Sequence, residues 1–312
     1  MLICPQCYQT NTACQACNGA GVTPDAQAHQ VPKKDIRLFG TKAYPIHASA
    51  VPEIIRCQWK AAMIYLATPD DESGEAADTG SMTHAAVAAW HRDKDIAAAI
   101  TALRESEAKF TKGNIPEATS MFYLYTRDPR NHCEIARDQE GRLLVEYKTE
   151  ISITPSNSFT TQAPIEIVGT LDQVRLIYSR PKVWDLKTSK RPGLDQLNMY
   201  LYQIGMYSLM ASKALGVPVA PGGLITPRHY KKGADPETSP PGIFWEYPLR
   251  FNDIGPLING LRNAVASIRA GLVHPSPGDY CRYCPMQSTG ECIPLLRSLT
   301  DAEYRIRDAA HS

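Results

Sequence analysis

Hydrophobic residues recur at two different spacings along the chain, and the spacing separates expected helices from expected strands. Apolar side chains three and four residues apart predict helices at residues 49–67, 81–92, 95–112, 194–215 and 253–270. Alternating or short apolar runs bounded by turn residues predict strands at residues 121–125, 133–138, 143–153, 165–178, 183–190, 223–226 and 243–249. Ser49 is the expected N-cap of the first helix, and Gly216 with Pro218 is the expected stop after residue 215.

The order of the expected elements in the central part of the chain is helix, three strands, helix, strand. This order predicts a mixed α/β sandwich in which helices flank a mixed sheet. No G-x-G-x-x-G or Walker loop occurs in the chain, so a Rossmann or P-loop nucleotide site is not expected.

Two of the expected strands carry aspartates. Asp172 lies in the run I-E-I-V-G-T-L-D-Q-V-R-L-I-Y, and Asp185 lies in V-W-D-L-K-T-S-K. Side chains two apart on a strand share a face, so Lys187 points to the same side as Asp185, and Leu186 points into the opposite layer. If the two runs pair, Asp172 lies beside Asp185, giving two oxygen ligands for a hard cation such as Mg²⁺ with an ammonium beside them.

Composition and net charge are those of an ordinary soluble globular protein. The chain has 312 residues, of which 43% are hydrophobic and 21% charged, as in a soluble globular protein. The net charge is +1, so binding to a polyanion has to come from a local groove rather than from a global basic field. The sequence has no apolar run long enough for a membrane span and no signal-peptide pattern at its start, and the expected location is cytoplasmic.

The first 28 residues hold two close cysteine pairs, C-x-x-C twice. Four thiolates at this spacing predict a zinc site with the ligands Cys4, Cys7, Cys14 and Cys17. A redox dithiol is the alternative. Gly19 and Gly21 extend the second pair to C-x-x-C-x-G-x-G, which resembles the zinc repeat of the DnaJ chaperones. The role of the segment stays open between partner contact, nucleic-acid contact and a structural staple.

A second group of cysteines lies near the other end, in Y-C-R-Y-C-P-M-Q-S-T-G-E-C. Its members are Cys281, Cys284 and Cys292. Three thiolates do not close a tetrahedral site, so a fourth ligand has to come from elsewhere. Cys57 and Cys133 are the only cysteines outside the two groups. Taken alone, Cys57 on its expected helix is explained as a buried apolar cysteine, which is common and needs no metal.

These pieces together resemble the PD-(D/E)XK nuclease superfamily, closest to its RecB-like branch and to the CRISPR-associated iron–sulfur exonucleases. The resemblance runs from about Ala48 to Cys292 and rests on five motifs in order: the early cysteine, G-x-x-x-H (Gly80 to His84), G-x-x-D (Gly169 to Asp172), D-x-K (Asp185 to Lys187) and Q-x-x-x-Y. The last motif occurs twice, at Gln196 to Tyr200 and at Gln203 to Tyr207, and the second is the better match to the end of the helix.

The resemblance implies a metal-dependent deoxyribonuclease. It implies that Mg²⁺ or Mn²⁺ is held by His84, Asp172, Asp185 and the backbone carbonyl of Leu186. Lys187 would orient water or stabilise the phosphate, and Gln203 and Tyr207 would position the DNA backbone or the site. For Tyr207 the alternative is core packing of an amphipathic helix. Glu146 and Glu150 are expected on a solvated strand face, with a supporting role at the site as the alternative.

The resemblance also implies a [4Fe–4S] cluster held by Cys57, Cys281, Cys284 and Cys292, which would clasp the C-terminal tail to the early helix. The expected organisation is a zinc segment at 1–28, a nuclease core at 29–275 and a cysteine clasp at 276–312. The best local basic patch for DNA is Arg228, His229, Lys231 and Lys232, with a solvated loop as its alternative.

The expected activity is exonuclease action on single-stranded DNA or DNA ends, in repair, recombination or CRISPR and phage DNA processing. A helicase, a recombinase or a CRISPR integration protein is an expected type of partner. Three alternatives remain open: an endonuclease on structured DNA, a non-catalytic zinc-containing adaptor that binds DNA, and an unrelated binding protein whose cysteines all hold structural zinc.

Overall fold

The computed structural model describes residues 35–67, 74–154, 163–188, 194–227 and 242–271, together with Val273, Cys281 and Cys284. The chain forms two compact units. The larger unit covers 40–52 and 70–265, and the smaller one covers 1–39, 53–69 and 266–312. Both aspartate-bearing strands belong to the larger unit.

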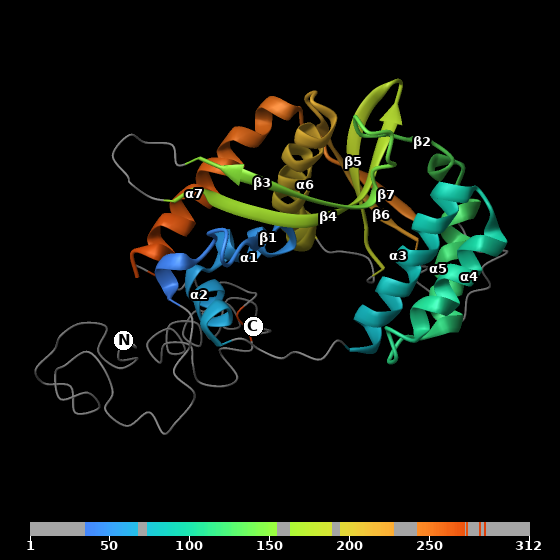
Figure 1. Cartoon of the computed structure of the whole chain (residues 1–312), viewed down its shortest axis with the longest axis horizontal. Coiled ribbons are helices and arrows are strands. Elements are labelled where there is room, and N and C mark those ends of the chain that lie inside the picture. The colour runs from blue at the N-terminus through green and yellow to red at the C-terminus, as the bar shows by residue number, and fades with distance from the viewer. Residues whose placement is uncertain are drawn as a thin grey trace, which may run out of the picture. The chain divides into compact units, whose positions relative to one another are not determined.

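A seven-stranded mixed sheet forms the core of the larger unit (Figure 1). Its strands are β1 (Ile46–His47), β2 (Glu134–Ile135), β3 (Val145–Ile153), β4 (Ile165–Ile177), β5 (Arg180–Leu186), β6 (Ala220–Thr226) and β7 (Ile243–Glu246). β4 is central, because β2 and β3 pair with it along one side and β1 and β5 along the other. β6 runs parallel to β5, and β7 is antiparallel to β6. The two aspartate-bearing runs therefore pair as neighbours, as the sequence predicts.

A two-residue turn sets the register between β4 and β5. Tyr178 and Ser179 both have left-handed backbone conformations, with φ of 50° and 61°. Two left-handed residues in a hairpin loop match the natural twist of the strands that they join. The register that follows places Gln173 opposite Trp184.

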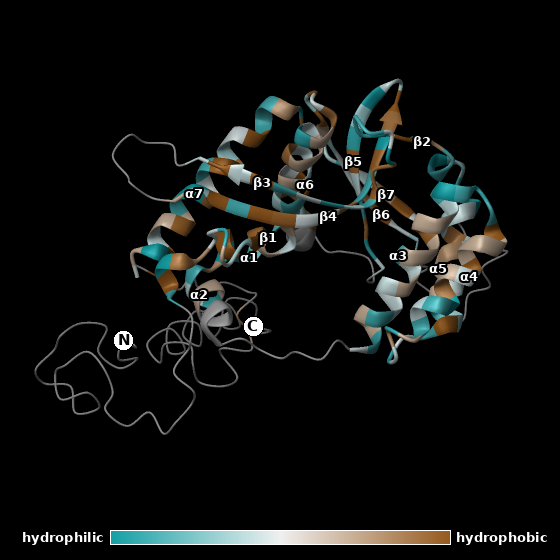
Figure 2. Ribbon diagram, in the orientation of Figure 1, coloured by the Kyte–Doolittle hydropathy of each residue, from teal (hydrophilic) through white to brown (hydrophobic). Residues whose placement is uncertain are grey.

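Helices cover both faces of this sheet. α3 (Glu75–Asp93), α4 (Ile96–Glu107) and α5 (Ile115–Arg127) form one group, and their apolar side chains share a buried cluster with Trp184 and Leu186. The alternating residues Asp185 and Lys187 point toward α6 (Leu194–Leu215) instead. The strand alternation thus divides β5 between an apolar layer and a polar layer. In Figure 2, β4 shows the same alternation as hydrophobic and hydrophilic bands.

A buried polar cluster ties α3 and α5 to β4. The Arg175 side chain is only 1% exposed, and its Nη2 donates hydrogen bonds to the Tyr125 hydroxyl at 3.0 Å and to Asn131 Oδ1 at 2.7 Å. Its Nε donates to Gln173 Oε1 at 2.8 Å. His91 Nε2 lies 2.6 Å from the same Tyr125 hydroxyl. The charged guanidinium of Arg175 is therefore stabilised by uncharged hydrogen-bond acceptors. These come from α5, from the turn after it and from β4.

One predicted strand is wrong. Residues 121–125 belong to α5, which begins after the N-cap Asn114 and carries a proline in its first turn. Ala118, Met121, Phe122 and Tyr125 are all buried, and their spacing of three and four residues is that of a helix. Residues 121–125 alone are aromatic and apolar, which is typical of a strand. The N-cap at Asn114 and the apolar spacing of three and four residues over the longer segment indicate a helix instead.

Two predicted boundaries also differ. α3 begins at Glu75 rather than near Ser81, because Gly74 caps it and the acidic residues of its first turn favour a helix N-terminus. The single helix expected after Ser49 is instead a short 3-10 turn η2 (Ala48–Ala50), followed by α1 (Val51–Arg56) and α2 (Gln58–Ala67), with Cys57 between them. Ser49 is therefore within the 3-10 turn and does not cap the helix.

The remaining elements overlap their predicted positions, but β5 spans 180–186 rather than 183–190, α4 ends at Glu107 rather than at residue 112, and β2 covers only two of the six residues predicted. α6 has the predicted bounds, and the last helix is α7 (Gly255–Arg269), preceded by the 3-10 turn η4 (Phe251–Ile254). The 3-10 turn η3 (Pro129–Asn131) follows α5. In the smaller unit, η1 (Ile36–Leu38) is followed by Phe39, whose carbonyl accepts a hydrogen bond from Arg269 Nε at 2.7 Å.

Candidate active site

Two buried aspartates face each other across β4 and β5. The register that pairs Gln173 with Trp184 brings Asp172 opposite Asp185 one residue further along. The two residues are 7% and 1% exposed. Asp172 Oδ2 accepts a hydrogen bond from the Leu186 backbone N–H at 2.7 Å, which fixes one carboxylate against the end of the neighbouring strand.

Burial makes these carboxylates costly to ionise together. Burial raises the pKa of Asp185 to about 7, with the neighbouring Asp172 adding to the rise and Lys187 opposing it. The pKa of Asp172 is also raised, again chiefly by burial. Among the described residues, the buried Asp185 Oδ2 has no well-directed hydrogen bond, although Lys187 Nζ lies 2.9 Å from it as an ion pair. A pair of close, desolvated carboxylates with an unsatisfied oxygen favours a bound cation.

Lys187 supplies the nearest fixed positive charge. Besides its ion pair with Asp185, its Nζ donates a hydrogen bond to Gln203 Oε1 at 3.2 Å and lies 4.7 Å from the centre of the Tyr200 ring. Burial lowers the pKa of this lysine, but the two aspartates more than offset the loss, and its pKa is raised overall. The ammonium is therefore charged and held by contacts on three sides.

α6 contributes an amide and a phenol one helical turn apart. Gln203 Nε2 donates a hydrogen bond to the Tyr207 hydroxyl at 2.8 Å and lies 3.4 Å from Asp185 Oδ1. Burial raises the pKa of Tyr207, and the nearby aspartates raise it further, so the phenol stays protonated. Tyr200, from the first of the two Q-x-x-x-Y motifs, also lines the cavity, so the tyrosines of both motifs face the site.

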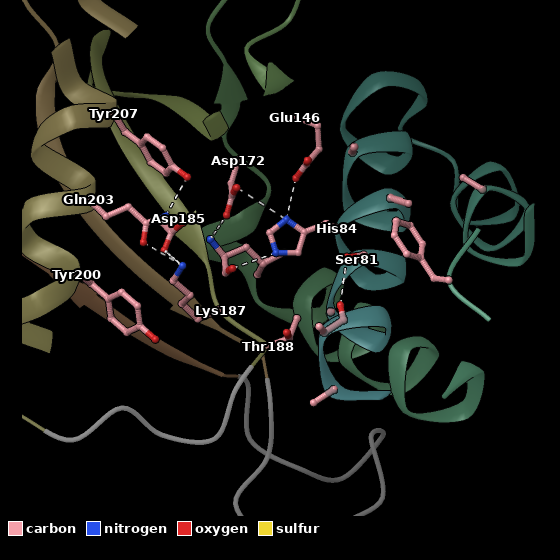
Figure 3. Close-up of a pocket in the computed structure, with 18 of the residues that line it drawn as sticks. Ser81, His84, Glu146, Asp172, Asp185, Lys187, Thr188, Tyr200, Gln203 and Tyr207 are labelled. Atoms are coloured by element: carbon pink, nitrogen blue, oxygen red, sulfur yellow. Dashed lines mark hydrogen bonds and ion pairs between the residues drawn. The ribbon is translucent and has the colours of Figure 1, made fainter. Parts of the chain in front are cut away.

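α3 brings His84 to the same place. Its Nε2 lies 3.0 Å from the Leu186 carbonyl, and its Nδ1 lies 2.7 Å from Glu146 Oε1. Figure 3 marks the contact between His84 and Glu146 with a dashed line. Its Nδ1 is also 3.8 Å from Asp172 Oδ1. Burial lowers the pKa of His84, but the carboxylates of Asp172, Glu146 and Asp185 together raise it to about 9.

The glycines of the two short motifs allow these approaches. A Cβ on Gly80 would lie 2.7 Å from Thr188 Oγ1, so a larger residue here would need Thr188 or α3 to shift. A Cβ on Gly169 would lie 3.2 Å from the Ala48 Cβ and 3.4 Å from the Tyr207 ring. The two glycines therefore set the distances at which His84 and Tyr207 meet the carboxylates.

Glu146 is the residue for which the sequence favoured the wrong reading, since its supporting role at the site was only the alternative there and the structure brings it to His84. It lies on β3 between the paired residues Val145 and Tyr147, across from Asp172, and its side chain is 32% exposed but paired with His84. Its φ is 47°, a left-handed conformation that is rare for a residue with a side chain. Alternation along β3 placed it on the correct face, but neither the backbone distortion nor the contact with His84 follows from alternation. Non-glycine residues in such conformations cluster at functional sites.

The donor set suits a hard divalent cation. One ligand atom from each of His84, Glu146 and Asp172 lies within 4.8 Å of the others, and this is the one such group of histidine, cysteine and acidic residues in the described ranges. Asp185 lies beside them. Carboxylate oxygens with one imidazole nitrogen match Mg²⁺ or Mn²⁺. The Leu186 carbonyl, also predicted as a ligand, accepts the His84 hydrogen bond in this arrangement.

All of these side chains open into one cavity of about 670 Å³. Figure 3 shows His84 from α3, the acidic residues from the sheet, Lys187 from just after β5, and Gln203 and Tyr207 from α6 converging on this space. The structure thus brings together every predicted residue of the carboxylate site: His84, Asp172, Asp185, Leu186, Lys187, Gln203 and Tyr207.

The cysteine predictions fall partly outside the described residues. Cys57 is buried, Cys281 and Cys284 are half-buried, and all three belong to the smaller unit. Cys292, the four cysteines of the N-terminal segment and the basic patch at 228–232 lie outside the described residues. The structure therefore leaves the iron–sulfur clasp and the zinc site as predictions.

Comparison with protein families places residues 46–289 in the PD-(D/E)XK nuclease superfamily. A comparison with curated proteins found no match to the chain. Of the helices in the described part of the chain, none is long and apolar enough to cross a membrane. The matched region includes α3, the whole sheet and α6, and so every residue of the cavity described above. Nucleases of this superfamily use Mg²⁺ or Mn²⁺ to cut DNA, which supports metal-dependent nuclease activity. The chain belongs to the PD-(D/E)XK nuclease superfamily.

Proposed function

We propose that this protein is a metal-dependent DNA exonuclease that acts on single-stranded DNA or DNA ends. One observation carries the proposal: three carboxylates, a histidine and a lysine converge in one cavity of a chain that belongs to a nuclease superfamily. Repair, recombination and CRISPR or phage DNA processing are the settings proposed for this activity, with a helicase, recombinase or integration protein as partner.

Asp172, Asp185, His84 and Glu146 would hold one or two divalent cations, with the Leu186 carbonyl as a further oxygen ligand. When bound, the cation neutralises charge on the phosphate and lowers the pKa of water, so that hydroxide is available near neutral pH. Asp185 fits this role because its buried Oδ2 has no directed hydrogen bond among the described residues.

The other side chains position the reacting groups. The Lys187 ammonium lies beside Asp185, where it can orient the attacking water or stabilise negative charge that develops on the phosphate. Gln203 holds the lysine through its amide oxygen and holds Asp185 and Tyr207 through its amide nitrogen. The Tyr207 hydroxyl, protonated because of its burial, is a donor for a phosphate oxygen.

The smaller unit carries the proposed iron–sulfur clasp. Cys57, Cys281, Cys284 and Cys292 would bind a [4Fe–4S] cluster with a structural role, and the first 28 residues would bind Zn²⁺. In support, the three proposed cluster ligands that the structure describes, Cys57, Cys281 and Cys284, belong to the same compact unit. Anaerobic purification with quantification of iron and zinc tests both metals, and zinc without iron would remove the clasp.

The experiment that tests the activity compares DNA substrates in the presence of Mg²⁺ or Mn²⁺. We expect degradation of linear single strands labelled at the 5′ or the 3′ end, with closed circular single strands left intact. Cleavage of closed circles would instead establish the endonuclease alternative. No cleavage of any substrate with either ion would favour a non-catalytic adaptor.

A further inference from the structure

A second cavity adjoins the candidate active site. It has a volume of about 640 Å³ and lies beside β1, β3 and β4. Asp172 and Tyr207 line both this cavity and the first one. The two cavities are therefore neighbours, with Asp172 and Tyr207 on the wall that they share.

The second cavity is lined by side chains that lack partners. Lys148, Ser49 and Thr170 make no side-chain hydrogen bond or ion pair within the described part of the chain, and His47, on the same cavity, makes none either. Lys148 is exposed on the surface of β3. Hydroxyl and ammonium donors that are not used within a fold are available to an anionic ligand.

The strand register relates these donors to the metal site. Lys148 pairs with Thr170 across β3 and β4, and both lie two residues from the facing pair Glu146 and Asp172. Residues two apart on a strand share a face and are separated by about 7 Å. Lys148 and Thr170 therefore lie on the face of the metal site, at a step along the sheet comparable with one nucleotide of an extended strand.

The two cavities differ in their chemistry. Alanines and the rings of Phe110 and Tyr200 line the first, which suits a sugar and a base. The second has only the rings of Tyr207 and His47 among its described lining residues, and its remaining polar groups include the carboxylate of Glu150. Glu150 lines the same cavity as Lys148, so the cavity is not strongly basic. Its donors for an anion are one ammonium group and the neighbouring hydroxyls.

We propose that this second cavity binds the phosphate adjacent to the scissile phosphate on a single DNA strand. Lys148 provides the ionic contact, and the hydroxyls of Ser49 and Thr170 provide hydrogen bonds. The inference rests on the proposed nuclease function and adds a substrate subsite to it. The subsite makes recognition depend on a strand longer than one nucleotide, and it does so through the backbone, without reading sequence.

The test compares a one-phosphate substrate with a longer strand. Thymidine 5′-(4-nitrophenyl phosphate) offers only the scissile phosphate, whereas a single-stranded oligothymidylate also offers its neighbour. In Lys148→Ala we expect KM for the oligothymidylate to rise about tenfold with kcat unchanged, since one phosphate contact is lost. Hydrolysis of the nitrophenyl ester should not change. The slope of log kcat/KM against log salt for the oligothymidylate should fall in magnitude by about 0.7.

Two variants serve as controls. Lys148→Arg keeps the charge and should restore most of the affinity for the oligothymidylate. Lys182→Ala removes another lysine of the sheet, one that is paired with Glu246, and should match the parent protein on both substrates. An unchanged KM for the oligothymidylate in Lys148→Ala, or an equal loss on both substrates, would overturn the subsite.

A binding measurement separates this inference from the activity itself. In an Asp185→Asn background, fluorescence anisotropy with labelled oligothymidylate reports binding without cleavage. Weaker binding on adding Lys148→Ala supports the subsite even if the parent protein cuts neither substrate, in which case the proposed nuclease function alone fails. Equal binding with and without Lys148→Ala overturns the subsite whatever the activity.

Discussion

Glu146 Oε1 lies 2.7 Å from His84 Nδ1, and it does so from a β-strand residue whose φ is 47°. This contact joins β3 to α3 across the rim of the cavity. The distorted backbone at Glu146 interrupts the regular pairing of β3 with β4 directly opposite Asp172. A strained strand position that aims a carboxylate at a histidine and an aspartate is expected where a cation binds.

Replacing Glu146 should weaken metal binding. In Glu146→Gln we expect Mn²⁺ affinity to fall about 10- to 100-fold, because the contact to His84 loses its charge and an oxygen ligand loses its anionic character. Isothermal titration with Mn²⁺ on the metal-free protein measures this. Glu134→Gln, an exposed glutamate on β2, is the matched control and should leave the affinity unchanged. Equal affinities in both variants would remove Glu146 from the site.

The close approach at Gly80 predicts a double-mutant cycle. Gly80→Ala places a Cβ 2.7 Å from Thr188 Oγ1, closer than these atoms pack, and we expect α3 to move away from the end of β5 and to carry His84 with it. We expect nuclease activity to fall as much as about 100-fold, the effect that a shift of about 1 Å can have on a catalytic group. Thr188→Ala removes the obstructing atom, and the double variant should recover most of the activity. Additive losses would show that the contact does not position His84.

Local patterns predicted most of the sheet and the carboxylate site. Asp172 and Asp185 follow from strand alternation and from the pairing of two runs close in sequence, both of which are short-range properties. α6 was predicted with its bounds because its apolar period is long and a glycine and a proline end it. His84 and the choice of Gln203 and Tyr207 came from the family resemblance, since helical periodicity alone does not bring α3 and α6 to one cavity.

The features that the sequence predicted wrongly or not at all depend on backbone conformation and on contacts between residues far apart in the chain. The contribution of Glu146 depends on a left-handed backbone conformation, for which a glutamate gives no local signal. Residues 121–125 look like a strand within a five-residue window, and they are helical because the cap at Asn114 and the packing of Phe122 and Tyr125 extend the pattern. The second cavity is also invisible in sequence, because it arises where three strands meet α6.

The buried imidazole of His91 should make the protein sensitive to acid. Burial, with Lys94 and Arg175 nearby, lowers the pKa of His91 to about 2, below the value of about 6.5 expected in the unfolded chain. Below pH 6.5 the unfolded state therefore takes up a proton that the folded state refuses. The contribution of His91 to the free energy of unfolding should fall by as much as about 1.4 kcal/mol per pH unit on acidification.

Urea unfolding at pH 7, 6 and 5 tests this, with His91→Gln as the comparison. Glutamine keeps an amide near Nε2 for the Tyr125 hydroxyl but does not titrate. We expect the stability difference between the parent protein and the variant to shrink steadily as the pH falls. A difference that is constant from pH 7 to pH 5 would show that His91 does not remain neutral in the folded protein.

If the proposed iron–sulfur cluster forms, replacing Cys57 and replacing Cys133 should have different effects on the iron content. Cys57→Ser should lose most of an expected content of about four iron atoms per chain after anaerobic purification, together with the visible absorption of the cluster. Cys133→Ser, in the larger unit, should keep both. Equal iron contents in the two variants would contradict the proposal that Cys57, and not Cys133, is a cluster ligand.

The central claim is that Asp185 and its neighbours bind a divalent cation to cut DNA. The most direct measurement is the rate of degradation of end-labelled single-stranded DNA by the full chain and by Asp185→Asn, with Mg²⁺, with Mn²⁺ and with a chelator. Asparagine keeps the shape of the side chain while removing the charge. We expect degradation by the parent protein with either ion, none with the chelator, and a rate at least about 100-fold lower in the variant. Degradation that survives the chelator, or an Asp185→Asn variant with full activity, would contradict it.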